Sequence, residues 1–273
     1  MSALSQPEHI RLERSGPVLH LWLNRPEVRN AMSRQMQGEI LETFNAIRDD
    51  RSVRIVVIRG AGGTFCAGGD IKNMQKSGAP AAAGATDELR RGNRRGGTML
   101  QTINTAPQAV ISVIEGFAMG GGFGLACVSD ISIIRADATM GLTEVTLGVV
   151  PAAISPFVVG RIGLTAARRL GVSGVRLNGT EAVQLGIAHV AVVDEAALVA
   201  ELKRNINQIL KCAPDAVAET KRLMLRAAAA MEIENLQELA ADSFVRAVRG
   251  PEGREGTLSF VEKRKPNWVT SID

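Results

Sequence analysis

The chain has 273 residues, of which 45% are hydrophobic and 22% charged, and its formal net charge is +4. This balance is typical of a globular protein with one large domain or a domain and an appendage, and it excludes a chain built around membrane spans. Its three cysteines have no CxxC spacing, which argues against a disulfide framework or a zinc site. Because residues 1–16 lack the apolar core of a secretory leader, we expect a cytoplasmic protein.

The first part of the chain predicts alternating strands and helices. Two strands are expected at residues 9–13 and 18–23, and apolar residues at helical spacing predict a helix over 33–50 with Ser33 as its cap. The unbroken apolar run at 53–58 predicts a strand that is buried on both faces. From residue 76 to 97 the composition favours a loop that leads into a basic helix.

The same order of elements recurs further along the chain. An apolar run at 110–114 leads through the glycine-rich segment 116–122 into an apolar helix at 123–128, and a strand follows at 131–135. Two such units predict a repeated strand–strand–helix spiral, which makes the fold class α/β. After Pro151 the chain is expected to be mostly helical, apart from a strand at 189–193. The later helices are predicted at 196–212, 215–228, 232–248 and 252–263, and we place a domain boundary between 1–194 and 195–273.

Several common kinds of site are missing from the sequence. No GxGxxG motif follows a strand and no GxxxxGK[ST] motif occurs, which argues against dinucleotide and P-loop sites. The three histidines, His9, His20 and His189, are far in sequence from the glycine clusters, and no metal-binding cluster is apparent. Carboxylates and backbone groups are left as the catalytic material, and neither a metal nor a separate cofactor is expected.

Two glycine-rich segments, 60–70 and 116–122, each follow a buried strand. The start of a helix presents N–H groups without intrahelical partners, and glycine lets a ligand oxygen approach them closely. Two such starts facing each other would form an oxyanion hole for a thioester enolate. The alternative is that the glycines only permit tight turns or close packing of a strand against a helix.

Four segments resemble motifs of the crotonase, or enoyl-CoA hydratase/isomerase, superfamily. Residues 23–32 resemble its LNRPxxxNAL motif, and residues 64–72 its FCAGADIK motif. Residues 116–126 are similar to GxxxGGGxEL and residues 255–264 to EGxxAFxEKR. The resemblance runs from about residue 21 to 265, in the order of the family.

The resemblance implies a crotonase-type spiral of ββα units (1–194) that binds acyl-CoA, followed by a helical trimerisation region (195–273). It implies a homotrimer or a dimer of trimers, with the N–H groups of Gly69 and Gly121 as the oxyanion donors. Coenzyme A then enters only as part of the thioester substrate. The implied substrate- and CoA-binding residues are Arg29, Ala31, Ala67, Gly68, Asp70, Ile71, Lys72, Gly120, Pro151, Phe260 and Lys263.

The number and position of the glutamates near the glycine-rich segments bear on which reaction is catalysed. Hydratases of the family with two glutamates carry the first just after the triple glycine, where this chain has Gly124, and the second matches Glu144. Glu144 alone is compatible with hydration or with Δ3–Δ2 isomerisation. The segments 122–126 and 149–159 resemble bacterial methylglutaconyl-CoA-type hydratases, which favours hydration of an α,β-unsaturated acyl-CoA.

A basic segment leaves further alternatives open. Four arginines (Arg90, Arg91, Arg94 and Arg95) are candidates for binding a carboxylate of the substrate, or they form a solvent-facing helix. The same segment permits RNA binding, which an aromatic content of 3% disfavours because few rings are available to stack on bases. A CoA-binding homologue without activity also remains compatible with Gly124.

Overall fold

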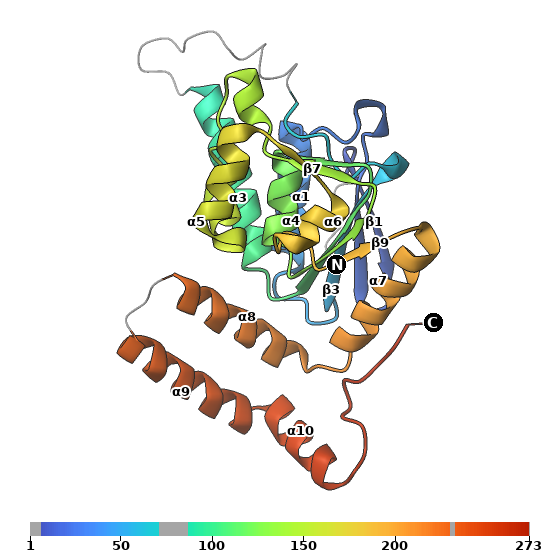
Figure 1. Ribbon diagram of the computed structural model, residues 1–273. Helices are drawn as coiled ribbons and strands as arrows, with labels where there is room; N and C mark the ends of the chain where they lie inside the picture. The colour runs from blue at the N-terminus through green and yellow to red at the C-terminus, as the bar shows by residue number, and fades with distance from the viewer. Residues whose placement is uncertain (1–6, 71–86, 230–232, 273) are drawn as a thin grey trace.

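The computed structural model describes residues 7–70, 87–229 and 233–272 of the 273-residue chain (Figure 1). The strands are β1 (Ile10–Ser15), β2 (Val18–Leu23), β3 (Ile55–Gly60), β4 (Ala109–Ile114), β5 (Phe117–Met119), β6 (Ile131–Arg135), β7 (Thr139–Gly141), β8 (Arg176–Asn178) and β9 (Val190–Val192). The α-helices are α1 (Arg34–Ile47), α3 (Glu88–Asn104), α4 (Gly121–Val128), α5 (Ser155–Ser173), α6 (Gly179–Gln184), α7 (Glu195–Ile209), α8 (Pro214–Ala228), α9 (Ile233–Arg249) and α10 (Pro251–Val261). The described residues also form the 3-10 turns η1 (Pro26–Val28), η2 (Ala61–Gly63) and η3 (Glu144–Leu147).

The main sheet has six strands in the order β1-β2-β3-β4-β6-β9. The hairpin β1–β2 is antiparallel, and every following pair is parallel. In β3 the side chains of Val56 and Ile58 enter one hydrophobic cluster, whereas Ile55 and Val57 enter a second cluster on the opposite face. The predicted strand with two buried faces is thus present.

Short strands form a second sheet, in the order β5-β7-β8. Two isolated parallel bridges, Cys66 with Ala118 and Met32 with Gly69, extend the same pairing toward the start of the chain. Successive turns of the chain therefore add a strand to the main sheet and a short strand or an isolated bridge to the second layer. This is the predicted spiral of ββα units.

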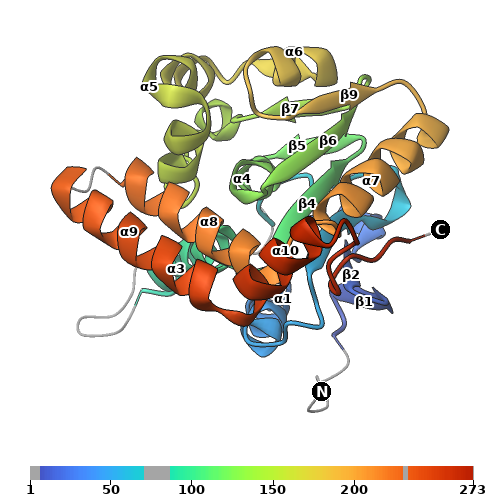
Figure 2. The same ribbon diagram turned by 90° about the horizontal axis from the view of Figure 1, so that it is seen from below.

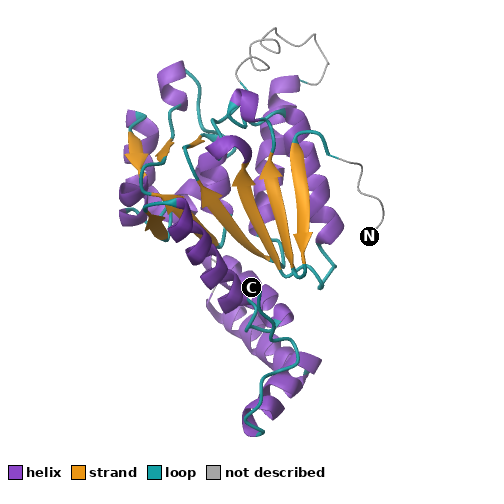
Figure 3. Ribbon diagram, turned by 90° about the vertical axis from the view of Figure 1, so that its right-hand side faces the viewer, coloured by secondary structure: helices purple, strands orange, loops and turns teal. Residues whose placement is uncertain are grey.

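Helices cover both faces of the main sheet. Residues of α1, α3 and α4 pack in the first cluster, and Leu198, Leu202 and Ile206 of α7 pack in the second. Figure 3 shows the strands of the main sheet with helices behind them. Ser33 caps α1, since its Oγ accepts the Met36 N–H at 3.0 Å, as predicted.

The last three helices project from the body of the molecule. Figures 1 and 2 show α8 and α9 side by side, with α10 following at the end remote from β7. The helix α7 belongs to the sheet core, while the predicted boundary between residues 194 and 195 stays a prediction. Within the described ranges, no helix has the length and apolar character needed to cross a membrane.

Candidate active site

The segment 64–70 lies between two other parts of the backbone that hold it on both sides. On one side the Cys66 N–H donates to the Phe117 carbonyl at 2.7 Å. On the other side the Ala67 N–H donates to the Arg29 carbonyl at 2.9 Å. Because bonds alternate between the two neighbours, successive peptides of this segment have fixed orientations.

One candidate oxyanion donor is the Gly69 N–H. The carbonyl of the same peptide, that of Gly68, accepts the Met32 N–H at 2.8 Å. A trans peptide points its C=O and N–H in opposite directions, so this bond turns the Gly69 N–H away from Met32. That N–H has no hydrogen-bond partner among the described residues, and Gly69 is exposed.

The second candidate donor is the Gly121 N–H, at the first residue of α4. Gly120, which precedes it, has φ 48° and ψ −110°, a conformation suited to glycine. Its N–H donates to the Gly141 carbonyl at 3.2 Å, and its carbonyl accepts the Gly124 N–H at 2.9 Å. In the described part of the chain the Gly121 N–H has no acceptor, and the start of α4 directs partial positive charge toward it.

The two glycine turns are in direct backbone contact. A Cβ atom added to Gly68, whose φ is +101°, would lie 3.4 Å from the Met119 carbonyl oxygen. A Cβ atom added to Gly120 would lie 3.7 Å from the Cα of Gly68. The fold thus brings together the two glycine-rich segments that the sequence singled out.

Glu144, the first residue of η3, lies beside these turns. Its Oε1 is 3.0 Å from the position that a Cβ atom of Gly120 would occupy. Its Oε2 is buried and has no hydrogen-bond partner within the described residues. Burial raises the pKa of the Glu144 carboxyl above its ordinary value, because the charged form loses solvent.

Gly124, one turn into α4, is enclosed by apolar side chains. A Cβ atom there would lie 2.7 Å from Ile154 Cγ2 and 3.2 Å from Leu100 Cδ1. Both side chains are buried. The space beside Gly124 is therefore filled, and a carboxylate at this position would need Ile154 to move.

The other predicted binding residues fall into separate groups. Ile71 and Lys72 lie outside the described residues. Asp70 pairs with Arg25 at 3.1 Å, and the Arg29 guanidinium lies over the Phe117 ring, 5.7 Å from its centroid. Four of the remaining residues lie at or beside the two glycine turns: Ala31, Ala67, Gly68 and Gly120. Pro151 lies in the loop before α5.

Phe260 and Lys263 belong to the projecting tail. Phe260 is 85% exposed, and α10 lies at the end of the molecule away from β7 (Figure 1), the strand that ends three residues before Glu144. Within a single chain the structure therefore does not bring these two residues to Glu144.

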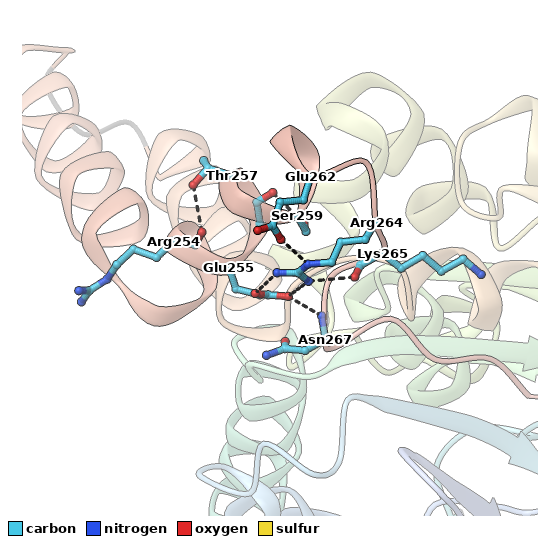
Figure 4. A network of polar contacts seen from close by, with 9 residues as sticks. Arg254, Glu255, Thr257, Ser259, Glu262, Arg264, Lys265 and Asn267 are labelled. Atoms are coloured by element: carbon cyan, nitrogen blue, oxygen red, sulfur yellow. Dashed lines mark hydrogen bonds and ion pairs between the residues drawn. The ribbon is translucent and has the colours of Figure 1, made fainter.

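A network of charged groups orders the turn after α10 (Figure 4). Arg264 donates to both carboxylate oxygens of Glu255, at 2.6 and 2.9 Å, and to Glu262 at 2.7 Å. Hydrogen bonds from Arg264 lower the pKa of Glu255 to about 2, so this pair stays ionised at neutral pH. Lys263, just before Arg264, has a left-handed backbone conformation with φ 53°.

The predicted basic helix is α3, which begins at Glu88 with Asp87 as its cap. All four of its arginines, Arg90, Arg91, Arg94 and Arg95, are exposed. Arg94 lines an open cavity of about 530 Å³ between α3 and the start of α5, together with Phe157. Local sequence patterns do not reveal this cavity, because its two walls are about sixty residues apart in the chain.

Comparisons with known proteins agree with this architecture. A model of the enoyl-CoA hydratase/isomerase family matches residues 13–271. The carnitinyl-CoA dehydratase of Proteus mirabilis is 34% identical over 275 residues, which cover 96% of this chain and 98% of that protein.

Solved structures are similar over the same length. Pseudomonas aeruginosa AtuE is 49% identical with a TM-score of 0.92, covering 96% of this chain and 100% of that one. An enoyl-CoA hydratase/isomerase from Marinobacter aquaeolei is 48% identical with a TM-score of 0.92, covering 96% and 99%.

Proposed function

The chain belongs to the enoyl-CoA hydratase/isomerase family, and we propose that it is a hydro-lyase that adds water to an α,β-unsaturated acyl-CoA. As an enzyme of this family it acts on acyl-CoA thioesters. In the proposal, the Gly69 and Gly121 N–H groups bind the thioester oxygen, and Glu144 transfers the proton.

The observation that carries the proposal is the position of Glu144. A half-buried carboxylate with a raised pKa lies against Gly120, in one of two adjoining turns that each present an N–H without a partner in the described residues. Negative charge develops on the thioester oxygen when water adds to the β-carbon, and the two N–H groups stabilise it. Glu144 takes a proton from the attacking water and then delivers it to the α-carbon, so that one water is added in total.

For the acyl chain, we propose a branched dicarboxylic group like that of methylglutaconyl-CoA. The resemblance of residues 122–126 and 149–159 supports this choice, and a free carboxylate needs a cationic partner. Arg94 is the candidate with a cavity beside it. Turnover of glutaconyl-type thioesters in preference to crotonyl-CoA is the expected result.

Isomerisation of a 3-enoyl-CoA is the second candidate, and the surroundings of Gly124 favour it. Ile154 and Leu100 occupy the space beside Gly124, so Glu144 is the carboxylate that lies against Gly120. One carboxylate suffices to carry one proton between two carbons.

The test is an assay of products. The purified protein is incubated separately with 3-methylglutaconyl-CoA, crotonyl-CoA and a 3-enoyl-CoA. The mass of each product is then measured by mass spectrometry. A product heavier by one water supports the hydratase. If the 3-enoyl thioester alone reacts and its product is an isomer of unchanged mass, the protein is an isomerase and the hydratase proposal is wrong. If no substrate gives a product, both the hydratase and the isomerase proposals are wrong.

The raised pKa of Glu144 predicts a pH dependence. As the base, Glu144 must be ionised in the free enzyme, so kcat/KM should fall as pH drops through its pKa, which lies above the ordinary 4.5. Initial rates measured between pH 4 and 9 check this. A flat profile down to about pH 4.5 would show that Glu144 is not the titrating base.

We also propose that the chain assembles as a trimer or a dimer of trimers. Phe244 on α9 and Phe260 on α10 are 70% and 85% exposed, and helices that project with such side chains need a partner. In a trimer, the tail of one copy would reach the CoA of its neighbour, which would give Phe260 and Lys263 their role. Light scattering is expected to give three or six times the 29.0 kDa chain mass, and a monomer would contradict the assembly.

A further inference from the structure

Two peptide groups connect the side chain of Arg25 to the Gly69 N–H. Arg25 Nη1 donates to the Ala31 carbonyl at 2.7 Å. The N–H at the other end of that peptide belongs to Met32, and it donates to the Gly68 carbonyl at 2.8 Å. The N–H at the far end of this second peptide is that of Gly69.

The direction of the hydrogen bonds is the same at every step. Each peptide accepts at its oxygen and donates from its N–H on the opposite edge, as trans geometry requires, and no cis peptide occurs in the described residues. A donor at the oxygen polarises the peptide and strengthens its N–H as a donor, by about 10–30% per bond in condensed phases. A cation at the start of the series acts on both peptides in the same sense.

The guanidinium of Arg25 is held in place from two sides. Its Nη1 also contacts Asp70 Oδ2 at 3.1 Å, and the two side chains are only 16% and 14% exposed. The backbone N–H of Arg25 donates to Asn30 Oδ1 at 2.8 Å. Asn30 is fully buried, and its amide donates to the Ala61 and Thr64 carbonyls at 2.8 and 2.6 Å.

We propose that Arg25 is a positioning residue whose charge acts through the Ala31–Met32 and Gly68–Gly69 peptides to orient and strengthen the Gly69 N–H as an oxyanion donor. This inference rests on the proposed function, because it presupposes that the Gly69 N–H binds the thioester oxygen. It adds a role for a side chain that does not itself touch the substrate.

The test uses the bound carbonyl as its probe. Butyryl-CoA labelled with ¹³C at the thioester carbonyl is bound to the protein, and isotope-edited infrared spectroscopy measures the shift of the C=O stretch. The wild-type shift is expected to be toward lower frequency. In Arg25→Gln, which replaces the cation with a shorter, neutral side chain, the shift should be smaller, and kcat should fall about tenfold or more with KM within about threefold.

A second variant guards against misfolding. Arg25→Gln removes the ion pair but keeps the charge of Asp70, whereas Arg25→Gln/Asp70→Asn replaces both charged groups with neutral amides. The double variant should show the same smaller shift. Arg59→Gln is the matched control, since Arg59 forms an ion pair of similar burial with Glu115 at 2.9 Å, and its carbonyl shift should equal that of the wild type.

The outcomes separate the two proposals. No shift in the wild type would contradict the oxyanion hole itself, whatever Arg25 does. A wild-type shift that persists unchanged in the double variant, with unchanged kcat, would overturn the role of Arg25. A lower melting temperature with an unchanged carbonyl frequency would likewise overturn it, because it would show a purely structural ion pair.

Discussion

Replacing Glu144 with glutamine is expected to lower kcat at least about a hundredfold, while the Kd for a CoA thioester stays within about threefold of wild type. The amide keeps the shape of the side chain but cannot take up a proton. Stability should not fall, because burial raises the pKa of Glu144 and its Oε2 has no hydrogen-bond partner in the described residues. A neutral side chain removes the cost of an ionised group there, so the melting temperature at pH 7 should be unchanged or higher.

Steady-state rates, calorimetric titration with a saturated acyl-CoA and thermal unfolding check these three expectations. Glu42→Gln is the control, since Glu42 is an exposed glutamate of α1, and its kcat should stay within about twofold of wild type. Turnover that survives in Glu144→Gln would show that Glu144 does not transfer the proton. The proton that reaches the α-carbon would then need another source.

Glutamate at Gly124 is expected to destabilise the protein by about 3 kcal/mol or more. Its Cβ would lie 2.7 Å from Ile154 Cγ2 and 3.2 Å from Leu100 Cδ1, and its carboxylate would be buried among apolar groups. The substitution would therefore not create a working two-carboxylate site. Urea unfolding at one fixed protein concentration measures the loss, because assembly would make the midpoint depend on concentration.

Two further variants sharpen this test. Gly38→Glu places the same side chain on α1, where an added Cβ meets nothing within 4 Å, and its stability should stay within about 1 kcal/mol of wild type. Ile154→Ala combined with Gly124→Glu should recover about 1 kcal/mol or more, since it removes the clash. A stable Gly124→Glu single variant with faster hydration would show that the space beside Gly124 is open and would contradict the structure.

Much of the fold followed from local patterns. Apolar runs and apolar spacing, together with turn and glycine signals, predicted β1 to β4, β6 and β9 and the helices α1, α4 and α7 to α10 within a few residues. The short strands β5, β7 and β8 were not predicted as a second sheet, because each has only three residues and lies in a glycine- or turn-rich segment. They exist because the spiral places them side by side.

For the site, the sequence by itself determined the materials: two glycine-rich turns after buried strands and, through the family motifs, Glu144. The tertiary structure decided what these groups meet. It placed Glu144 against Gly120, put Ile154 beside Gly124, and joined Arg25 to Asp70 across 45 positions of sequence. Local patterns report only the period and capping of each element, whereas contacts between distant loops depend on the order and register of the strands that carry them.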